Sequence, residues 1–282
     1  MRFGFHISIS GGLAKVAERA KGLQCETIQI FPFNPRGWQY AEFDASAAMQ
    51  MRSDLKSAGI EPVIVHASYL PNLASPNPAL FDKSIGVLCE TMGRAEAMGA
   101  AFVNVHVGSG MGASEAEALA TVSRAVNTIL VSVPNTVTLL LENTAGGGTE
   151  LGHNFTQIEA IIDKVTDERR VGVCLDTAHA FEAGYDVATA EGLDATLEEF
   201  RARLGWNRLK ALHLNDSRSA QGSHADRHWH IGEGEIGLAA FKHIVNHRRL
   251  AHLPAIMETP RTSDKEDKKN MRTVRRLAAT GP

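Results

Sequence analysis

Val137-Thr138-Leu139-Leu140-Leu141-Glu142 is a short apolar run that ends in a carboxylate. Its length and its aliphatic composition are typical of a β-strand that is buried on both faces. The segment Val171-Gly172-Val173-Cys174-Leu175-Asp176 repeats the pattern farther along the chain, with an amphipathic stretch between the two. Buried strands that alternate with helical segments predict an α/β protein with a parallel sheet.

Eight runs of this kind recur along the chain. Between the third and the fourth, apolar residues from Phe81 to Ala95 recur at helical spacing, and Gly99 follows as a helix stop. Eight strand–helix units in 282 residues predict a closed (β/α)8 TIM barrel and a single domain, residues 1–282. An open doubly wound sheet is the alternative, but Ser8–Gly12 lacks the full glycine fingerprint of that fold. The predicted strands are Phe3–Ile7, Thr27–Phe31, Pro62–His66, Phe102–His106, Val137–Glu142, Val171–Asp176, Leu209–Asn215 and Ala255–Glu258.

Composition and charge argue against several classes of protein. The formal net charge of -3 gives no overall basic footprint, which disfavours a non-specific nucleic-acid coat but leaves a local basic patch open. The three cysteines are too few and too scattered for a disulfide framework, so we expect free thiols in a reducing compartment. The first residues lack the apolar run of a signal peptide, and no apolar stretch is long enough for a membrane span. We therefore expect a cytoplasmic protein with no membrane partner.

The residues that close these runs point to a metal site. Most of the runs end in, or lead to, a histidine or an acid, and a barrel gathers the C-terminal ends of its strands around one mouth. One such residue alone could be a cap or a core group paired with the backbone. Several together would bury repelling carboxylates at a large cost, which divalent metal ions remove. The strand-end residues are His66, His106, Glu142, Asp176, His213 and Glu258.

Two local pairs enlarge this set to nine candidate metal ligands. His179 lies three residues after Asp176, so the two side chains could serve neighbouring ions. Asp226 and His228 are two residues apart, which places both on one face of an extended backbone. Because one zinc ion takes about four ligands, nine candidates predict a cluster of two or three ions, with a carboxylate such as Glu142 bridging.

The other histidines have weaker expected roles. His6 ends the first strand and is either a core group or a residue that supports the ligands. A rim or supporting role, or no role, is expected for His153, His224 and His230, and a surface position for His243, His247 and His252.

Several ordered segments form a pattern that is far more specific than any single residue. The longest covers residues 173–186 and reads Val-Cys-Leu-Asp-Thr-Ala-His-Ala-Phe-Glu-Ala-Gly-Tyr-Asp. The others are His66–Leu70, Glu142–Gly146, His213–Ser217, Gly222–Ser223, Asp226–His228 and Ile231–Gly234. In this order, from Phe3 to about Leu277, the sequence resembles the endonuclease IV family of abasic-site DNA repair nucleases.

The resemblance implies a trinuclear zinc site that hydrolyses duplex DNA 5′ to an abasic site and leaves a 3′-hydroxyl. It also implies that Glu142 bridges two ions and that Glu258 orients or deprotonates the attacking water, so both are expected to be catalytic. Removal of 3′-blocking groups, Mn²⁺ at one or more positions and a monomeric state are further expectations. The implied ligands are His66, His106 and Glu142 for the first ion, Glu142, Asp176, His213 and Glu258 for the second, and His179, Asp226 and His228 for the third.

The family also inserts side chains into the duplex to flip the abasic nucleotide out. The matching positions are Arg36, Tyr69 and Leu70, with loop packing as the alternative role for the last two. Two positions depart from the family pattern, since Val107 stands where proline is expected and Trp229 adjoins the Asp-Arg-His segment. Both affect loop shape, and neither removes a candidate ligand.

Two other classes of function remain open. A sugar isomerase or epimerase shares this barrel but needs about four ligands, which leaves His179, Asp226 and His228 unexplained. A non-catalytic DNA-lesion binder would not need a complete ligand set. The glycine spacing of Gly108–Gly112 predicts a flexible rim loop, not a nucleotide-binding turn, and the mixed charges of Lys265–Arg276 predict a solvated final helix.

Overall fold

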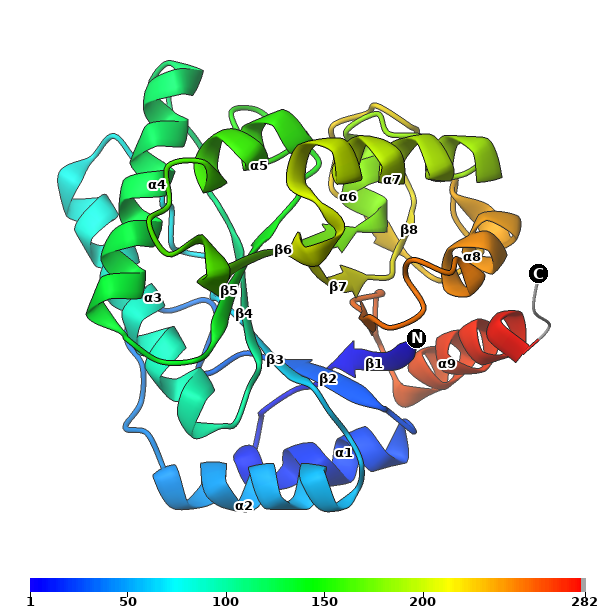
Figure 1. The fold of residues 1–282 in the computed structure, drawn as a ribbon. Coiled ribbons are helices and arrows are strands. Elements are labelled where there is room, and N and C mark those ends of the chain that lie inside the picture. Colours follow the sequence, from blue (N-terminus) through cyan, green and yellow to red (C-terminus); the bar gives the residue numbers. More distant parts are fainter. Residues whose placement is uncertain (280–282) are drawn as a thin grey trace.

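Parallel strands form a closed barrel in the computed structural model, which describes residues 1–279 (Figure 1). Each strand pairs with the strand that precedes it around the ring. The ring closes where Arg2 of the first strand lies opposite Pro254 of the last. The predicted (β/α)8 TIM barrel is therefore confirmed. Its strands are β1 (Arg2–His6), β2 (Thr27–Ile30), β3 (Val63–His66), β4 (Phe102–His106), β5 (Thr138–Glu142), β6 (Val171–Asp176), β7 (Leu209–His213) and β10 (Pro254–Met257).

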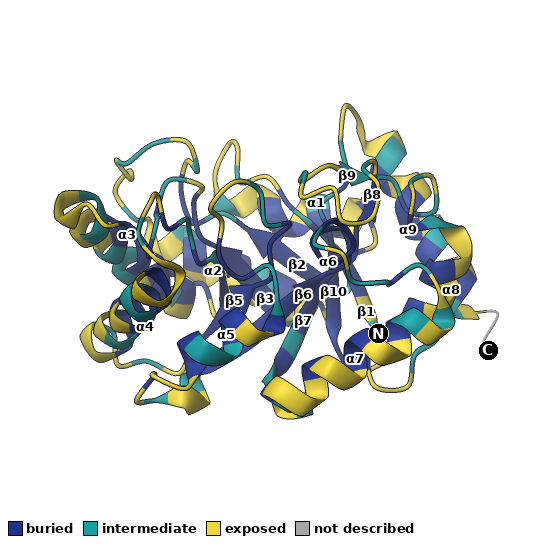
Figure 2. Ribbon diagram, turned by 90° about the horizontal axis from the view of Figure 1, so that it is seen from above, coloured by how far each residue is buried: buried dark blue, intermediate teal, exposed yellow. Residues whose placement is uncertain are grey.

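Helices surround the barrel, with their buried faces toward the strands and their exposed faces outward (Figure 2). Gly99 follows α3 with φ 72°, a left-handed conformation that ends the helix as predicted. No helix within residues 1–279 is long and apolar enough to cross a membrane. The helices are α1 (Val16–Gly22), α2 (Ala45–Ser57), α3 (Pro78–Ala97), α4 (Glu115–Ser132), α5 (Phe155–Ile162), α6 (Thr177–Glu182), α7 (Ala190–Leu204), α8 (Gly237–Asn246) and α9 (Asp264–Ala279), with 3-10 turns at Leu13–Lys15, Glu168–Arg170 and Trp206–Arg208.

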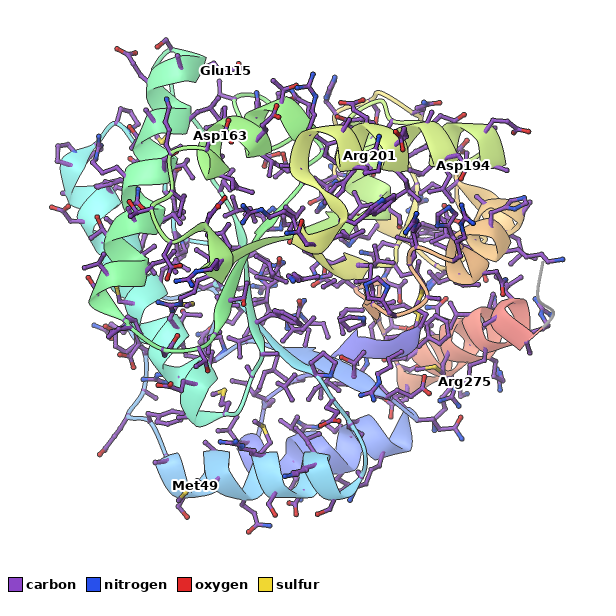
Figure 3. All side chains as sticks on the ribbon, in the orientation of Figure 1. Met49, Glu115, Asp163, Asp194, Arg201 and Arg275 are labelled. Atoms are coloured by element: carbon purple, nitrogen blue, oxygen red, sulfur yellow. The ribbon has the colours of Figure 1, made fainter. Side chains whose placement is uncertain are left out.

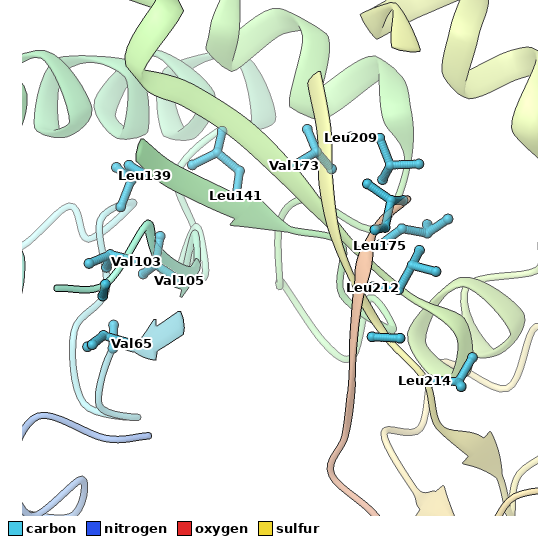
Figure 4. Packing of buried hydrophobic residues seen from close by; sticks show 14 of the residues in the cluster. Val65, Val103, Val105, Leu139, Leu141, Val173, Leu175, Leu209, Leu212 and Leu214 are labelled. Atoms are coloured by element: carbon cyan, nitrogen blue, oxygen red, sulfur yellow. The ribbon is translucent and has the colours of Figure 1, made fainter. Parts of the chain in front are cut away.

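Alternation along the strands creates two apolar layers. Aliphatic residues such as Leu139, Leu141 and Val173 form the large core between strands and helices (Figure 4). The residues between them point into the barrel and form a second, smaller cluster. That cluster consists of Ile64, Leu140, Cys174, Ala211 and Ile256, with Phe102 packed against it. Charged side chains such as Glu115 and Arg201 project from the outer helices into solvent (Figure 3).

The inner cluster forms the floor beneath the candidate site. Residues two apart on a strand share one face, so each floor residue is followed on its own face by a polar one. Leu140 thus leads to Glu142, and Cys174 leads to Asp176. The same step leads from Ile64 to His66, from Ala211 to His213 and from Ile256 to Glu258. The ionisable side chains therefore form one layer inside the barrel, directly above the apolar floor.

Six predicted strands differ from the structure by one or two residues at an end, and the errors at the C-terminal ends of the last two strands both involve Asn215. The seventh strand ends at His213 and not at Asn215, because the Asn215 N–H donates to Thr177 Oγ1 (3.0 Å) and no longer to a strand. Glu258 lies just beyond β10, because its N–H donates to Asn215 Oδ1 (2.8 Å). The bounds of β4 and β6 match the prediction. The other strands corrected are Phe3–Ile7, Thr27–Phe31, Pro62–His66 and Val137–Glu142, now Arg2–His6, Thr27–Ile30, Val63–His66 and Thr138–Glu142.

The C-terminal helix was predicted as solvated, and this is correct for one face only. Asn270, Met271 and Val274 of α9 are buried, and the helix packs against α8 and β1. The prediction rested on the many charged residues of this segment. The apolar residues recur at helical spacing between lysines and arginines, and they form the buried face that the charges alone do not reveal.

Candidate metal centre

A cavity of about 610 Å³ opens at the C-terminal ends of the strands. Its walls include His66, His106, His179 and Glu258, and its rim includes Tyr69. Beneath it lies the apolar floor described above. The cavity is therefore where the predicted strand-end residues meet.

Three groups of donor atoms lie within this region, each with all its atoms within 4.8 Å of one another. The second group shares Glu142 with the first and Asp176 with the third, so they form one continuous layer. Asp226 belongs to none of the three, but its carboxylate lies 3.5 Å from His179 Nε2 and 3.5 Å from His228 Nε2. All nine predicted ligands thus lie in one place. The groups are His66, His106 and Glu142; Glu142, Asp176, His213 and Glu258; and Asp176, His179 and His228.

Glu142 lies at the centre of this layer and is fully buried. Its Oε2 lies 3.3 Å from His66 Nε2 and 3.1 Å from His106 Nε2, while its Oε1 lies 2.9 Å from His213 Nδ1. Burial alone would raise the pKa of Glu142, but His106 and His213 outweigh it and hold that pKa well below its ordinary value. Its two oxygens therefore carry negative charge toward two different groups of histidines.

Asp176 divides its two oxygens between structure and site. Oδ1 accepts the His179 N–H (2.9 Å) and so caps the short helix α6. Oδ2 accepts from Asn215 Nδ2 (2.7 Å) and lies 3.5 Å from His228 Nε2. The strand end and the helix start therefore place Asp176 and His179 together, as the three-residue spacing predicted.

Three histidines are oriented by a hydrogen bond from one of their two ring nitrogens. His66 Nδ1 donates to the Ala67 carbonyl (2.7 Å), and His179 Nδ1 donates to the Asn143 carbonyl (2.9 Å). His213 Nε2 lies 2.9 Å from Gln29 Oε1. In the neutral ring, the opposite nitrogen then carries a lone pair directed at the carboxylates.

The arrangement fits divalent cations. His179 Nε2 and His228 Nε2 lie 3.1 Å apart, so two ring nitrogens face each other and need a proton or a cation between them. In the metal-free protein, protons fill this role: burial opposes the charged ring, but Asp176, Asp226 and Glu142 raise the pKa of His179 well above its ordinary value. Imidazole and carboxylate together suit zinc and similar ions. The residues present therefore fit a metal cluster.

Buried amides support the ionisable residues, and the sequence reasoning missed them. Asn143 Oδ1 accepts the Asp176 N–H (2.7 Å), and its Nδ2 donates to the Asp176 carbonyl (3.1 Å). Asn104 Nδ2 donates to Glu142 Oε2, and Asn215 links Asp176 to Glu258. Each of these amides lies inside or beside an apolar run, and that position could have revealed it. A search for histidines and acids at the strand ends does not detect it.

The loop that carries Asp226 and His228 is held by two buried carboxylates. β8 (Asp216–Ser217) and β9 (His228–Trp229) form a short antiparallel ribbon, which the sequence analysis did not predict. Asp216 accepts the N–H groups of Gly232 and Gly234 (2.9 Å each), and Glu182 accepts from Ser217 Oγ (2.6 Å) and Arg227 N (2.9 Å). Two candidate ligands that are far in sequence from any barrel strand are thereby fixed over the cavity.

The predicted insertion residues lie at the rim. Tyr69 is 67% exposed, and its ring meets Phe31 edge-on at 5.2 Å. The Tyr69 N–H donates to the Pro35 carbonyl (3.3 Å), which ties its loop to the one that carries exposed Arg36. Leu70 is half-buried and lines the cavity. The three side chains thus lie on two joined loops at one side of the mouth.

Asn72 ties the neighbouring rim loop in place. Its Oδ1 accepts from Ser109 N (3.0 Å), and its Nδ2 donates to the Ser109 carbonyl (2.9 Å). Gly108 has φ 105°, and a Cβ there would lie 2.1 Å from Asn72 Oδ1, so glycine is required for this approach. The segment predicted as a rim loop is therefore at the rim and is bonded to the loop after β3.

The remaining histidines and the two unusual positions have clear places. His6 Nδ1 lies 3.3 Å from Glu258 Oε1, so His6 supports the site. Val107 is buried against the Gly152 loop, and Trp229 stacks with the Arg218 guanidinium at 4.5 Å. His153 and His224 lie beside each other next to Gly146, and His230 lies within hydrogen-bond distance of Asn270. His243 and His252 are exposed, and His247 pairs with Asp194 on the surface.

Comparison with known proteins places this chain in a family. The family of xylose isomerase-like TIM barrels matches residues 17–279. "Probable endonuclease 4" of Halothermothrix orenii is 42% identical over 94% of this chain and 96% of the relative, and that of Methanoculleus marisnigri is 40% identical over 98% of both. The crystal structure of endonuclease IV from Thermus thermophilus superposes with a TM-score of 0.90 at 34% identity over 100% of both chains.

Sugar-converting enzymes share the fold. A D-tagatose 3-epimerase-like protein superposes with a TM-score of 0.75 at 16% identity over 99% of this chain and 98% of its own, which shows a common barrel and no more. The higher identity and the fuller superposition lie with the endonucleases. The chain therefore belongs to the endonuclease IV family, metal-dependent nucleases built on the xylose isomerase-like TIM barrel.

Proposed function

We propose that this protein is a DNA repair endonuclease that hydrolyses the phosphodiester 5′ to an abasic site in duplex DNA and leaves a 3′-hydroxyl. The observation that carries the proposal is the continuous layer of donor groups, in which Glu142 and Asp176 each belong to two groups. The names and folds of the relatives support the same activity. Removal of 3′-blocking groups is proposed as a second activity of the same cavity.

The nine residues would hold three divalent ions, with zinc as the principal metal and Mn²⁺ acceptable at one or more positions. When bound, such ions act as Lewis acids toward the phosphodiester and lower the pKa of water. The assignment follows the three donor groups except in the third, where Asp226 takes the place of Asp176 because of its distances to His179 and His228. Asp176 is then given to the second ion alone. The proposed ligand sets are His66, His106 and Glu142; Glu142, Asp176, His213 and Glu258; and His179, Asp226 and His228.

Glu258 is proposed to orient the attacking water and to accept its proton. Its side chain is 18% exposed toward the cavity, whereas those of Glu142 and Asp176 are fully buried. Burial opposes ionisation, but His213 and other neighbours keep the pKa of Glu258 well below its ordinary value. A charged carboxylate at the cavity wall can hold a water molecule by a hydrogen bond and remove its proton. Glu142 is proposed to bridge two ions.

Selection of damaged DNA is proposed to occur at the rim. An abasic nucleotide has no base to unstack or unpair, so its extrusion costs less than that of an intact nucleotide. Tyr69 and Leu70 line the mouth and would fill the space left in the duplex, while Arg36 on the joined loop would contact phosphate. A monomer, one catalytic domain over residues 1–282 and a cytoplasmic location complete the proposal.

A sugar isomerase or epimerase is less well supported. Such an enzyme needs about one group of four ligands, and the second donor group would suffice. It leaves the adjoining group of Asp176, His179 and His228 without a role. The two buried carboxylates that fix the Asp226 loop would also be unexplained.

The test is cleavage of a duplex that carries one tetrahydrofuran abasic analogue, with the undamaged duplex as control. The protein is stripped with a chelator and reloaded with zinc before the assay. Specific incision 5′ to the analogue by the reloaded protein is expected. Absence of incision, or equal cleavage of both duplexes, would refute the proposed function, and isomerisation of free ketohexoses would favour the alternative.

A further inference from the structure

Gln29 lies beneath the cavity and has no role in the ligand set. It belongs to β2, faces into the barrel and is fully buried. In the strand register it lies opposite His6 of β1. A buried amide of this size needs hydrogen-bond partners, since leaving its polar atoms unpaired is costly.

All of the partners of Gln29 belong to the candidate metal centre. Its Nε2 donates to Glu258 Oε1 (2.6 Å) and lies 3.0 Å from His6 Nδ1. Its Oε1 lies 2.9 Å from His213 Nε2. One neutral side chain thereby joins β1, β7 and the segment after β10 across the barrel.

The partners fix which way the amide points. The charged Glu258 carboxylate can only accept, so the nitrogen of Gln29 must face it and the oxygen must face His213. Because that oxygen can only accept, His213 must carry a hydrogen on Nε2. In the neutral ring the lone pair is then on Nδ1, which lies 2.9 Å from Glu142 Oε1 and 3.1 Å from Glu258 Oε2.

We propose that Gln29 is a positioning residue that orients His213 and Glu258, two members of the second donor group. It selects the His213 nitrogen that can bind a cation, and it fixes the rotation of the Glu258 carboxylate at the same time. Partners of this kind change metal affinity by roughly 10- to 100-fold when they are removed. The inference rests on the metal centre proposed above, and it adds a residue that determines the geometry of one of its three metal positions.

The central test is Gln29→Met, which keeps the length of the side chain and removes both hydrogen-bonding groups. Competition with a chromophoric chelator should show one class of zinc bound about 10- to 100-fold more weakly, with the other classes little changed. In the zinc-loaded protein, the His213 Nε2–H resonance should lose its downfield shift and its protection from exchange. Unchanged zinc affinity with an unchanged resonance would overturn the proposal.

Gln157→Met is the matched control. Gln157 is also a buried glutamine, and it accepts from Gly152 N (2.7 Å) and donates to Glu115 (2.7 Å). Its loss should lower stability and leave the three zinc affinities unchanged. An equal loss of zinc affinity in this variant would overturn the proposal, because any buried amide would then have the same effect.

Gln29→Glu keeps the test decisive if the methionine variant does not fold. It retains an acceptor for His213, so the His213 resonance should keep its downfield shift. It also places a second carboxylate beside Glu258, so kcat should fall at least about tenfold with little change in KM. Loss of the resonance or an unchanged kcat in this variant counts against the proposal.

The zinc and resonance measurements need no DNA, which separates this inference from the proposed function. A wild type that binds zinc but cleaves no abasic duplex would refute the substrate alone. A wild type that binds no zinc would refute both.

Discussion

Glu258 occupies the position where the donor layer meets the open cavity, and its proposed role is tested by Glu258→Gln. The amide keeps the shape of the side chain but cannot accept the proton of an attacking water. We expect kcat on the abasic duplex to fall by about 10²- to 10⁴-fold, the usual worth of a general base. Single-turnover cleavage with zinc content measured on the same sample checks this.

Glu150→Gln is the control for that variant. Glu150 lines the same cavity but belongs to none of the three donor groups. Its substitution should change kcat less than about threefold, within ordinary context effects on surface residues. Full activity in Glu258→Gln with a normal zinc content would remove Glu258 from the chemistry.

The pH dependence of the metal-free protein follows from opposite pKa shifts in one cluster. The pKa of Glu142 lies well below the ordinary 4.5, so its contribution to stability is present above that pH and is lost as pH falls. Burial opposes the charge on His179, but Asp176, Asp226 and Glu142 raise its pKa well above 6.5, so its contribution is complete below that pH and is lost as pH rises through the raised value.

Stability of the metal-free protein should therefore be highest between about pH 4.5 and 6.5. In the proposed centre zinc would replace the protons on the histidines, so the zinc-loaded protein should keep its stability through the neutral range. Thermal unfolding as a function of pH, with and without a chelator, measures both curves. Two parallel curves above pH 6.5 would contradict the predicted exchange of protons for metal.

Individual residues also show which parts of the candidate metal centre can be predicted from the sequence. His66 and Glu142 were identified because each ends an apolar run, and a barrel makes all such ends neighbours. Gln29 and Asn143 were missed because amides carry no charge and occur in many buried places. Their role depends on hydrogen bonds between strands distant in sequence, which no local pattern encodes.

At the scale of elements, the β8–β9 ribbon depends on Asp216. This fully buried carboxylate accepts backbone N–H groups from Gly232, Gly234 and Ile236 at 2.9, 2.9 and 3.0 Å. Asp216→Ala should lower the free energy of unfolding by about 2–4 kcal/mol, because several buried donors lose a charged acceptor. It should also weaken the binding of the ion assigned to Asp226 and His228. Urea denaturation and zinc competition measure the two effects.

Asp44→Ala is the control for this variant. It removes a hydrogen-bonded carboxylate that lies far from the β8–β9 ribbon, so it shows what such a loss costs when the ribbon is intact. Asp44 caps the outer helix α2 by accepting the Ala47 N–H (2.9 Å). Its removal should cost about 1 kcal/mol and leave zinc affinity unchanged. A normal zinc affinity in Asp216→Ala would show that the ribbon holds its ligands by other contacts.

The elements themselves were predicted with uneven success. The strands and α3 were recognisable because apolar period and glycine stops agree. The ribbon was not, since β8 and β9 contain two residues each and are held by side chains of other segments. The buried face of α9 was not predicted because the prediction for this helix rested on its charged residues and did not consider the spacing of Met271 and Val274.

At the scale of the whole molecule, the proposed metal cluster should stabilise the barrel as one unit, since six of its proposed ligands end or directly follow the strands β3, β4, β5, β6, β7 and β10. Removal of zinc leaves buried carboxylates and imidazoles that must hold protons instead. We expect the zinc-loaded protein to contain about three ions per chain and to unfold at a temperature at least several degrees above that of the stripped protein. Elemental analysis and calorimetry of both forms test this, and a single ion per chain would refute the cluster.

The order of the barrel layers has a consequence for how this chain can change over generations. Floor and donor residues alternate with residues that face the helices, so inserting or deleting one residue within a strand would turn its donor outward into the apolar layer. Insertions and deletions should thus be confined to the loops and the outer helices. Among relatives, length differences should fall there, while the spacing from Leu140 to Glu142 or from Cys174 to Asp176 stays constant.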